Sequence, residues 1–273
     1  MTVIATNTAA LRATNASTSA NSALSTAMER LSTGKRINSA KDDAAGLAIA
    51  TSMQTQIGGM QQGIRNANDG ISMAQTAEGA LDEVTNMLQR MRELGVQATN
   101  GTYSSTDLGN IAVEQKALAD QITSVLANTQ FNGQKLFDGT AGTSGAVKIQ
   151  YGANASDSTT LSLGNLTTGS IKTATDLATG TAAATTLATF DTAINAVSTA
   201  RAGLGAAQNQ LQSAVNNMTN NVANLSDAQS RIQDADFSTE STNLAKAQIL
   251  SQASTAMLAQ ANQSQQGVLK LLQ

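Results

Sequence analysis

The sequence of 273 residues contains no proline, cysteine, tryptophan or histidine. Without histidine and cysteine, the imidazole bases and thiolate nucleophiles of many catalytic sites are absent, and carboxylates are the only common zinc ligands left. No disulfide can form, so a secreted form would depend on packing or assembly for its stability. These absences argue against an enzyme, and the sequence indicates neither a metal site nor a cofactor.

Aromatic residues make up only 2% of the sequence and charged residues only 13%. So few aromatic side chains disfavour one large core, and without proline long helices are not interrupted. The net charge of -3 offers no basic patch for phosphate groups, so nucleic acid is not an expected partner. No apolar run approaches the roughly 20 residues of a membrane-spanning helix. Because Met1–Asn7 also lacks the features of a signal peptide, we expect any secretion to use another route.

A heptad repeat in the last third of the chain is the strongest positive signal. Apolar residues alternate there with spacings of four and three, which predicts about 60 Å of helix whose seam needs a partner. Arg201, Gln208 and Gln229 are polar exceptions that we expect to set the register of the pairing. The seam consists of Phe190, Ile194, Val197, Arg201, Leu204, Gln208, Leu211, Val215, Met218, Val222, Leu225, Gln229 and Ile232.

A second long helix is predicted to begin near Asp42 or Asp43. Its two seam rows are Ala50, Ile57, Ile64 and Ile71, and Met53, Met60, Ala67, Ala74, Leu81 and Leu88, with Glu78 and Thr85 interrupting the first row. Gly58, Gly59, Gly63 and Gly70 lower its helix propensity by about 1 kcal/mol each, so the helix needs tertiary partners. A third helix is expected over residues 106–129, and a last one from about Ser241.

The middle of the chain has a different character. Val147, Ile149 and Tyr151 alternate with polar residues, as do Leu161 and Leu163, which predicts a β-hairpin. Asn132-Gly133 and Asp138-Gly139 are turn dipeptides, and the low-complexity residues 167–186 are expected to form an exposed loop.

The predicted fold class is mainly α. Long antiparallel helices pair the N- and C-terminal halves into a rod-like coiled-coil bundle, with a small β-hairpin in the middle. We expect a terminal helical domain of residues 1–43 with 236–273, a helical domain of residues 44–140 with 187–235, and a hairpin and loop region of residues 141–186. The terminal segments have weak apolar stripes, so we expect them to become ordered only when copies assemble.

Several segments at both ends of the chain carry distinctive motifs: Glu29–Gly46, Leu88–Leu94, Gln130–Gly133, Ser230–Asp236, Ala247–Leu250, Leu258–Gln263 and Val268–Leu272. Together, in this order, they resemble bacterial flagellins. The resemblance implies a structural subunit of the extracellular flagellar filament, which serves motility, in a minimal form with little or no variable outer domain. It also implies unfolded export by the flagellar type III system. The implied partners are further copies in a helical homopolymer, the cap protein, hook–filament junction proteins and an export chaperone.

The resemblance also suggests two sets of site residues. The apolar residues expected to drive polymerisation are Ile4, Leu11, Leu24, Met28, Leu31, Leu250, Met257, Ala261, Val268 and Leu272. A vertebrate innate immune receptor that reads flagellin would contact Leu88, Gln89, Arg90, Glu93, Leu94, Gln97 and Glu114. Gly95 replaces the alanine usual in the family, which bears on helix rigidity.

Other interpretations remain open at this point. Heptad stripes alone usually form an intramolecular core, and Arg90, Arg92 and Glu93 could be an ordinary solvated helix face. A hook–filament junction protein shares the N-terminal motif and the paired helices. A flagellin carrying a metalloprotease would need an HExxH motif, which a chain without histidine cannot have. The acidic balance argues against a membrane-active helical toxin or adhesin.

Overall fold

The computed structural model describes residues 6–178 and 186–270. These residues form six helices: α1 Thr8–Thr33, α2 Ala44–Ala98, α3 Ser105–Asn128, α4 Ser170–Ala178, α5 Thr186–Gln233 and α6 Phe237–Lys270. The strands are β1 Gln130–Phe131, β2 Gln134–Lys135, β3 Ala146–Gln150 and β4 Ser158–Ser162. The predicted fold class, mainly helical with a hairpin in the middle, is confirmed.

The chain divides into two compact units. Unit 1 comprises residues 1–55 and 224–273, and unit 2 comprises residues 56–223. Unit 1 therefore combines the two ends of the sequence, and unit 2 is the continuous stretch between them. The three-part division expected from the sequence stays a prediction.

Side chains next to the helix ends explain where several helices begin and end. Asp43 accepts a hydrogen bond from the Gly46 amide at 2.8 Å, so α2 begins at Ala44. Ser104 and Asp107 form a reciprocal capping box at the start of α3. Gly34 ends α1 in the left-handed conformation, with φ at 70°. The starts of α2 and α3 agree closely with the sequence-based expectations.

The expectation of a loop over residues 167–186 is wrong in part, because residues 170–178 form α4. Ile171 and Ala174, three positions apart, are buried on one face of this helix, which packs against α3. The threonine-rich composition hid this short stripe, and a tertiary partner stabilises a helix that local propensity alone would not. Residues 179–185 lie outside the described residues.

Two antiparallel helices form the frame of unit 2. Arg92 of α2 pairs with Asp191 of α5 at 2.6 Å, and Arg201 of α5 pairs with Asp82 of α2 at 2.9 Å. Gln208 donates to the Glu78 carboxylate at 2.8 Å. Two polar exceptions of the heptad seam therefore meet polar partners on the opposite helix.

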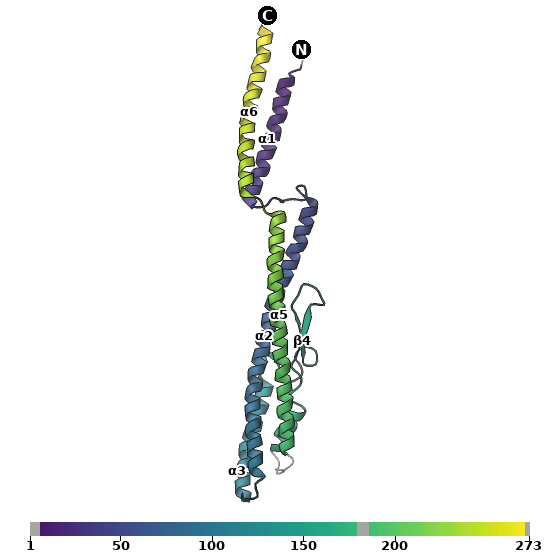
Figure 1. Ribbon diagram of the computed structural model, residues 1–273, viewed down its shortest axis with the longest axis vertical. Coiled ribbons are helices and arrows are strands. Elements are labelled where there is room, and N and C mark those ends of the chain that lie inside the picture. The colour runs from purple at the N-terminus through teal and green to yellow at the C-terminus, as the bar shows by residue number, and fades with distance from the viewer. Residues whose placement is uncertain (1–5, 179–185, 271–273) are drawn as a thin grey trace. The chain divides into compact units, whose positions relative to one another are not determined.

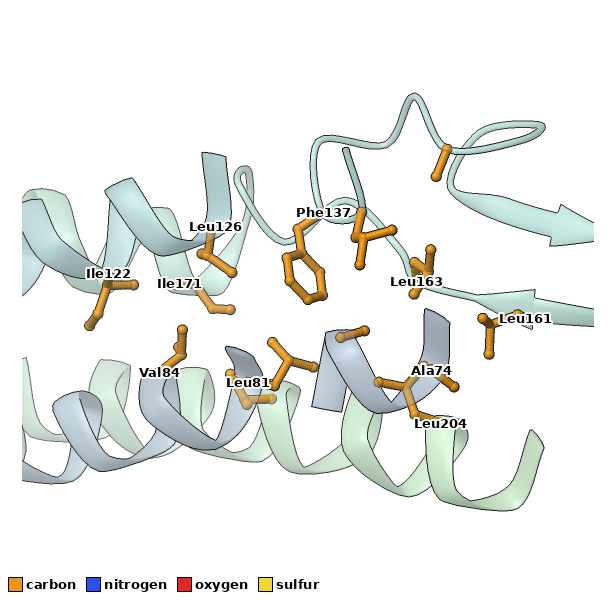
Figure 2. Packing of buried hydrophobic residues seen from close by; sticks show 14 of the residues in the cluster. Ala74, Leu81, Val84, Ile122, Leu126, Phe137, Leu161, Leu163, Ile171 and Leu204 are labelled. Atoms are coloured by element: carbon orange, nitrogen blue, oxygen red, sulfur yellow. The ribbon is translucent and has the colours of Figure 1, made fainter. Parts of the chain in front are cut away.

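The core of unit 2 lies where these helices meet α3, α4 and the middle segment. Phe137, which is fully buried, points between the side chains of Leu81, Leu126 and Ile171 (Figure 2). Leu161 and Leu163 bring the hairpin segment to the same cluster as Leu204 of α5 (Figure 2). Most of the buried apolar side chains of unit 2 belong to one cluster, although few of them are aromatic.

The β3–β4 hairpin lies directly on two glycines of α2, Gly63 and Gly70. A Cβ atom at Gly63 would collide with the backbone carbonyl of Tyr151, and one at Gly70 would collide with Ile149. Asn66, between these glycines, donates to the Gln150 carbonyl at 2.9 Å. The glycines that weaken the helix thus create the space in which the hairpin docks.

Candidate assembly and recognition surfaces

A seam of small side chains joins α1 and α6 in unit 1. Asn7 donates to the Ala261 carbonyl at 3.2 Å, and Ser251 donates to Asn21 at 2.9 Å, so the two helices run antiparallel. They lie side by side in Figure 1, in purple and yellow. The buried residues of this seam are Ala13, Ala20, Ala27, Glu240, Ala247 and Ser254. Apart from Glu240, these residues are small, which allows the two helices to approach closely.

The residues predicted to drive polymerisation fall into two groups. Leu24, Leu31 and Ala261 are half-buried along the seam. Four others are largely exposed: Leu11 at 59%, Met28 at 57%, Leu250 at 47% and Met257 at 67%. Ile4 and Leu272 lie outside the described residues, and of Val268 the structure describes only its place in α6. The predicted set is therefore not one intramolecular stripe.

Helix α6 carries a second, exposed stripe beside the seam. Lys246, Leu250, Ala253 and Met257 follow one another at spacings of four, three and four, and all four are exposed. This spacing keeps them on one face of the helix. The face has the heptad period of a helix-packing surface, and no described part of the chain covers it.

Sequence reasoning missed the seam because it ranked positions by hydrophobic size. A signal was available in the alternating spacing of four and three along Ala13, Ser17, Ala20, Leu24, Ala27 and Leu31. This spacing assigns Ala27 to the buried seam and leaves Met28 outside it. Reasoning also missed two exposed apolar residues of α6, Phe237 and Ile249.

Within unit 1, hydrogen bonds join Gly34 and Arg36, which follow α1, to residues 232–235 at the end of α5. The Arg36 amide donates to the Gln233 carbonyl and its guanidinium donates to the Ile232 carbonyl, both at 2.7 Å. The Ala235 amide donates to the Gly34 carbonyl at 3.0 Å. These bonds satisfy carbonyl groups that the end of a helix leaves free. Two of the segments that carry the family resemblance, Glu29–Gly46 and Ser230–Asp236, therefore contact one another.

Asp42 stabilises the turn that follows Arg36 in the chain. Its carboxylate accepts hydrogen bonds from the Ser39 amide at 2.9 Å, the Asn38 amide at 3.1 Å and the Ser39 hydroxyl at 3.1 Å. Because these donors favour the charged form, they lower the pKa of Asp42 below its ordinary value of 3.8. The Asp42-Asp43 pair thus has a structural use, as a turn and a helix start.

Arg90 is the centre of a polar network on the surface of unit 2. Its guanidinium donates to Glu114 of α3 at 2.8 Å and to Glu93 at 3.3 Å. Glu114, followed by Glu93, raises the pKa of Arg90. Gln97 donates to the Tyr103 hydroxyl at 3.2 Å. Three of the residues predicted to contact a receptor, Arg90, Glu93 and Glu114, are thus connected across α2 and α3. Gln89 is exposed on the same helix as Arg90.

Leu88 and Leu94, predicted to contact the same receptor, are buried in unit 2, at 0% and 2% exposure. Their burial disfavours a direct contact by these two side chains, and the receptor-contact set as a whole stays a prediction. Gly95 lies against Leu187 and Phe190 of α5, where a Cβ atom would be 3.4 Å from each.

Among residues 6–178 and 186–270, no group of three or more histidine, cysteine, aspartate or glutamate side chains could hold a metal ion. None of the described helices is long and apolar enough to span a membrane.

Comparisons with known proteins match both ends of the chain. Residues 4–142 match the bacterial flagellin N-terminal helical region, and residues 187–272 match the bacterial flagellin C-terminal helical region. A flagellin of Halalkalibacterium halodurans is 45% identical over 249 residues, covering 90% of each chain. A flagellin of Bacillus subtilis is 44% identical over 298 residues, covering 97% of this chain and 98% of the other. A crystal structure of Bacillus cereus flagellin is similar at 33% identity, with a TM-score of 0.48, over 56% of this chain and 88% of that one.

Proposed function

Because this chain belongs to the bacterial flagellin family, we propose that it is a structural subunit of the flagellar filament outside the cell and assembles there with copies of itself. The observation that supports assembly is the exposed stripe of α6. Leu250 and Met257 present large apolar side chains at heptad spacing, whereas the seam with α1 is made mostly of small residues. Burial of these side chains between subunits would release free energy that the single chain does not gain.

Export and capping belong to the same proposal. The chain leaves the cell unfolded through the flagellar type III system with an export chaperone, and it meets cap and hook–filament junction proteins at the filament. Family membership supports these partners. The absence of cysteine suits a chain that is threaded and then folds in an oxidising exterior.

Filament formation can be tested by negative-stain electron microscopy after addition of ammonium sulfate, which strengthens apolar burial. We expect long uniform filaments from the full chain. The double variant Leu250→Asn/Met257→Asn should raise the critical concentration at least about tenfold, because both side chains lose contacts that are worth about 1.5–3 kcal/mol when fully buried.

Ile249→Asn is the matched control, because Ile249 is 66% exposed and lies on a neighbouring face of α6. It should have a clearly smaller effect than the double variant. If the full chain forms no filaments even with filament fragments as seeds, the junction-protein interpretation replaces this proposal.

The Arg90 network supports a second role, recognition by a vertebrate flagellin receptor. The exposed guanidinium, Glu93 and Glu114 come together on one surface, and arginine is common among residues that dominate binding energy. In a cell reporter assay we expect Arg90→Ala to reduce signalling at least about tenfold. Arg65→Ala is the control, because Arg65 is an exposed residue of α2 that pairs with Gln62 of its own helix. Equal signalling by both variants and the parent chain would refute this role.

A further inference from the structure

An open groove of about 720 Å³ runs between α1 and α6 in unit 1. On the α1 side it is lined by small side chains, most of them hydroxyl-bearing, such as Ser19, Ser22 and Thr26. On the α6 side it is lined by Asn243, Lys246 and Leu250. The groove therefore adjoins the exposed stripe of α6, with which it shares two residues.

An unusual ion pair lies in this groove. Glu240 is only 8% exposed, and its carboxylate is 3.7 Å from the Arg30 guanidinium. Well-formed arginine–carboxylate pairs have hydrogen bonds of about 2.7–2.9 Å. The pairs that join α2 to α5 in unit 2 have such distances, at 2.6 Å for Arg92–Asp191 and 2.9 Å for Arg201–Asp82. The more buried pair is thus the looser one.

The Arg30 guanidinium also has an unused donor. Its Nε atom is buried and has no hydrogen-bond partner among the described residues. A buried donor without an acceptor is unfavourable, and guanidinium groups favour planar, two-bond contacts with carboxylates. A small movement of the side chain into the groove would allow such a contact if an acceptor were present there.

We infer that this groove receives a second copy of the chain, and that a carboxylate of that copy completes the hydrogen bonds of Arg30. This inference rests on the proposed self-assembly. The charges support it, because Arg30 and Lys246 face the groove against the single carboxylate of Glu240. Exposed carboxylates are available on another copy, for example at Glu29. The adjoining Leu250 and Met257 extend the contact with apolar surface.

The groove can be probed directly because the chain has no cysteine of its own. Ser22→Cys places the only thiol in the groove, and Ser25→Cys places one on an exposed part of α1 outside it. The rate of thiol labelling would be measured for monomer and for polymer. We expect polymerisation to slow labelling of the groove thiol at least about tenfold, and that of the control thiol much less. Labelling of the groove thiol at the same rate in both states would overturn the inference.

Arg30→Lys tests the role of the guanidinium, because lysine keeps the charge but lacks the Nε donor and the planar fork. We expect the critical concentration to rise at least about fivefold while thermal unfolding of the monomer, followed by circular dichroism, stays unchanged. Arg12→Lys, an exposed arginine of α1 outside the groove, should change neither. An unchanged critical concentration, or a rise matched by a lower melting temperature of the monomer, would refute the role of Arg30. If the parent chain itself forms no filaments, the proposed function fails instead.

Discussion

Two glycines of α2, five residues apart, have opposite surroundings. In the part of the chain that the structure describes, no neighbouring atom lies within 4 Å of the position of a Cβ atom at Gly58, whereas a Cβ atom at Gly63 would collide with the backbone of Tyr151. In a sequence both positions read as the same defect in a long helix. The hairpin lies over Gly63, so the absence of a side chain is required there and not at Gly58.

The same substitution at these two positions should therefore have opposite effects. We expect Gly58→Ala to raise the free energy of unfolding by up to about 1 kcal/mol, because alanine favours the helix. Gly63→Ala should lower it by about 1–3 kcal/mol, because the backbone of the hairpin must shift. Urea unfolding followed by circular dichroism measures both. A stabilised Gly63→Ala variant would show that the hairpin does not dock on this part of α2.

Between elements, polar residues in an apolar seam fix the alignment of α2 and α5. Glu78 interrupts the apolar row of α2, Gln208 interrupts that of α5, and the two side chains meet at 2.8 Å. Any shift of one helix along the other would place both polar groups against apolar side chains. The pairing therefore favours one register.

Removal of one member of this pair should be more harmful than removal of both. We expect Gln208→Leu to lower the free energy of unfolding by about 1–3 kcal/mol, because the Glu78 carboxylate loses its donor. The double variant Gln208→Leu/Glu78→Leu should regain most of this loss, because two leucines suit a heptad seam. Gln212→Leu, on the exposed outer face of α5, should stay within about 0.5 kcal/mol of the parent chain. Additive effects of the two substitutions would contradict the pairing.

The long helices could be predicted from the sequence because their seams hold large apolar residues at regular spacing. The helix α3 was predicted to within one residue at each end, and α2 from the acidic residues that precede it. The α1–α6 seam and α4 were not predicted, because alanine, serine and threonine mark a buried face too weakly against a background rich in the same residues. Which of the residues predicted to contact a receptor are exposed, and which are buried, could be decided only once the face of α2 that packs against the core was known.

At the scale of the molecule, large apolar side chains are buried unevenly. The cluster that includes Phe137, Phe190, Leu81 and Leu204 lies wholly within unit 2. Among the described residues of unit 1, the buried apolar residues are alanines except for Ile37. Because apolar burial is the main stabilising contribution, unit 2 holds most of the stability of the single chain.

This contrast leads to a prediction about proteolysis. We expect a broad-specificity protease to remove the α1 and α6 segments from the monomer while residues of unit 2 survive, because local opening is easiest where few apolar contacts are lost. In the polymer both segments should be protected. Mass spectrometry of the fragments at matched digestion times identifies the cleavage sites. Equal protection of the ends in both states would mean that the α1–α6 pair is stable by itself.

In unit 1, small residues lie between α1 and α6, and large apolar residues lie on the exposed stripe of α6. This placement also affects how a filament begins to grow. Two free molecules that collide gain one contact, and each must first restrain a terminal pair that has little stability of its own. A molecule that arrives at an existing end meets several ordered neighbours at once and gains many contacts for the same loss of freedom. Nucleation should therefore be far slower than elongation, and new subunits should join existing filaments rather than start new ones.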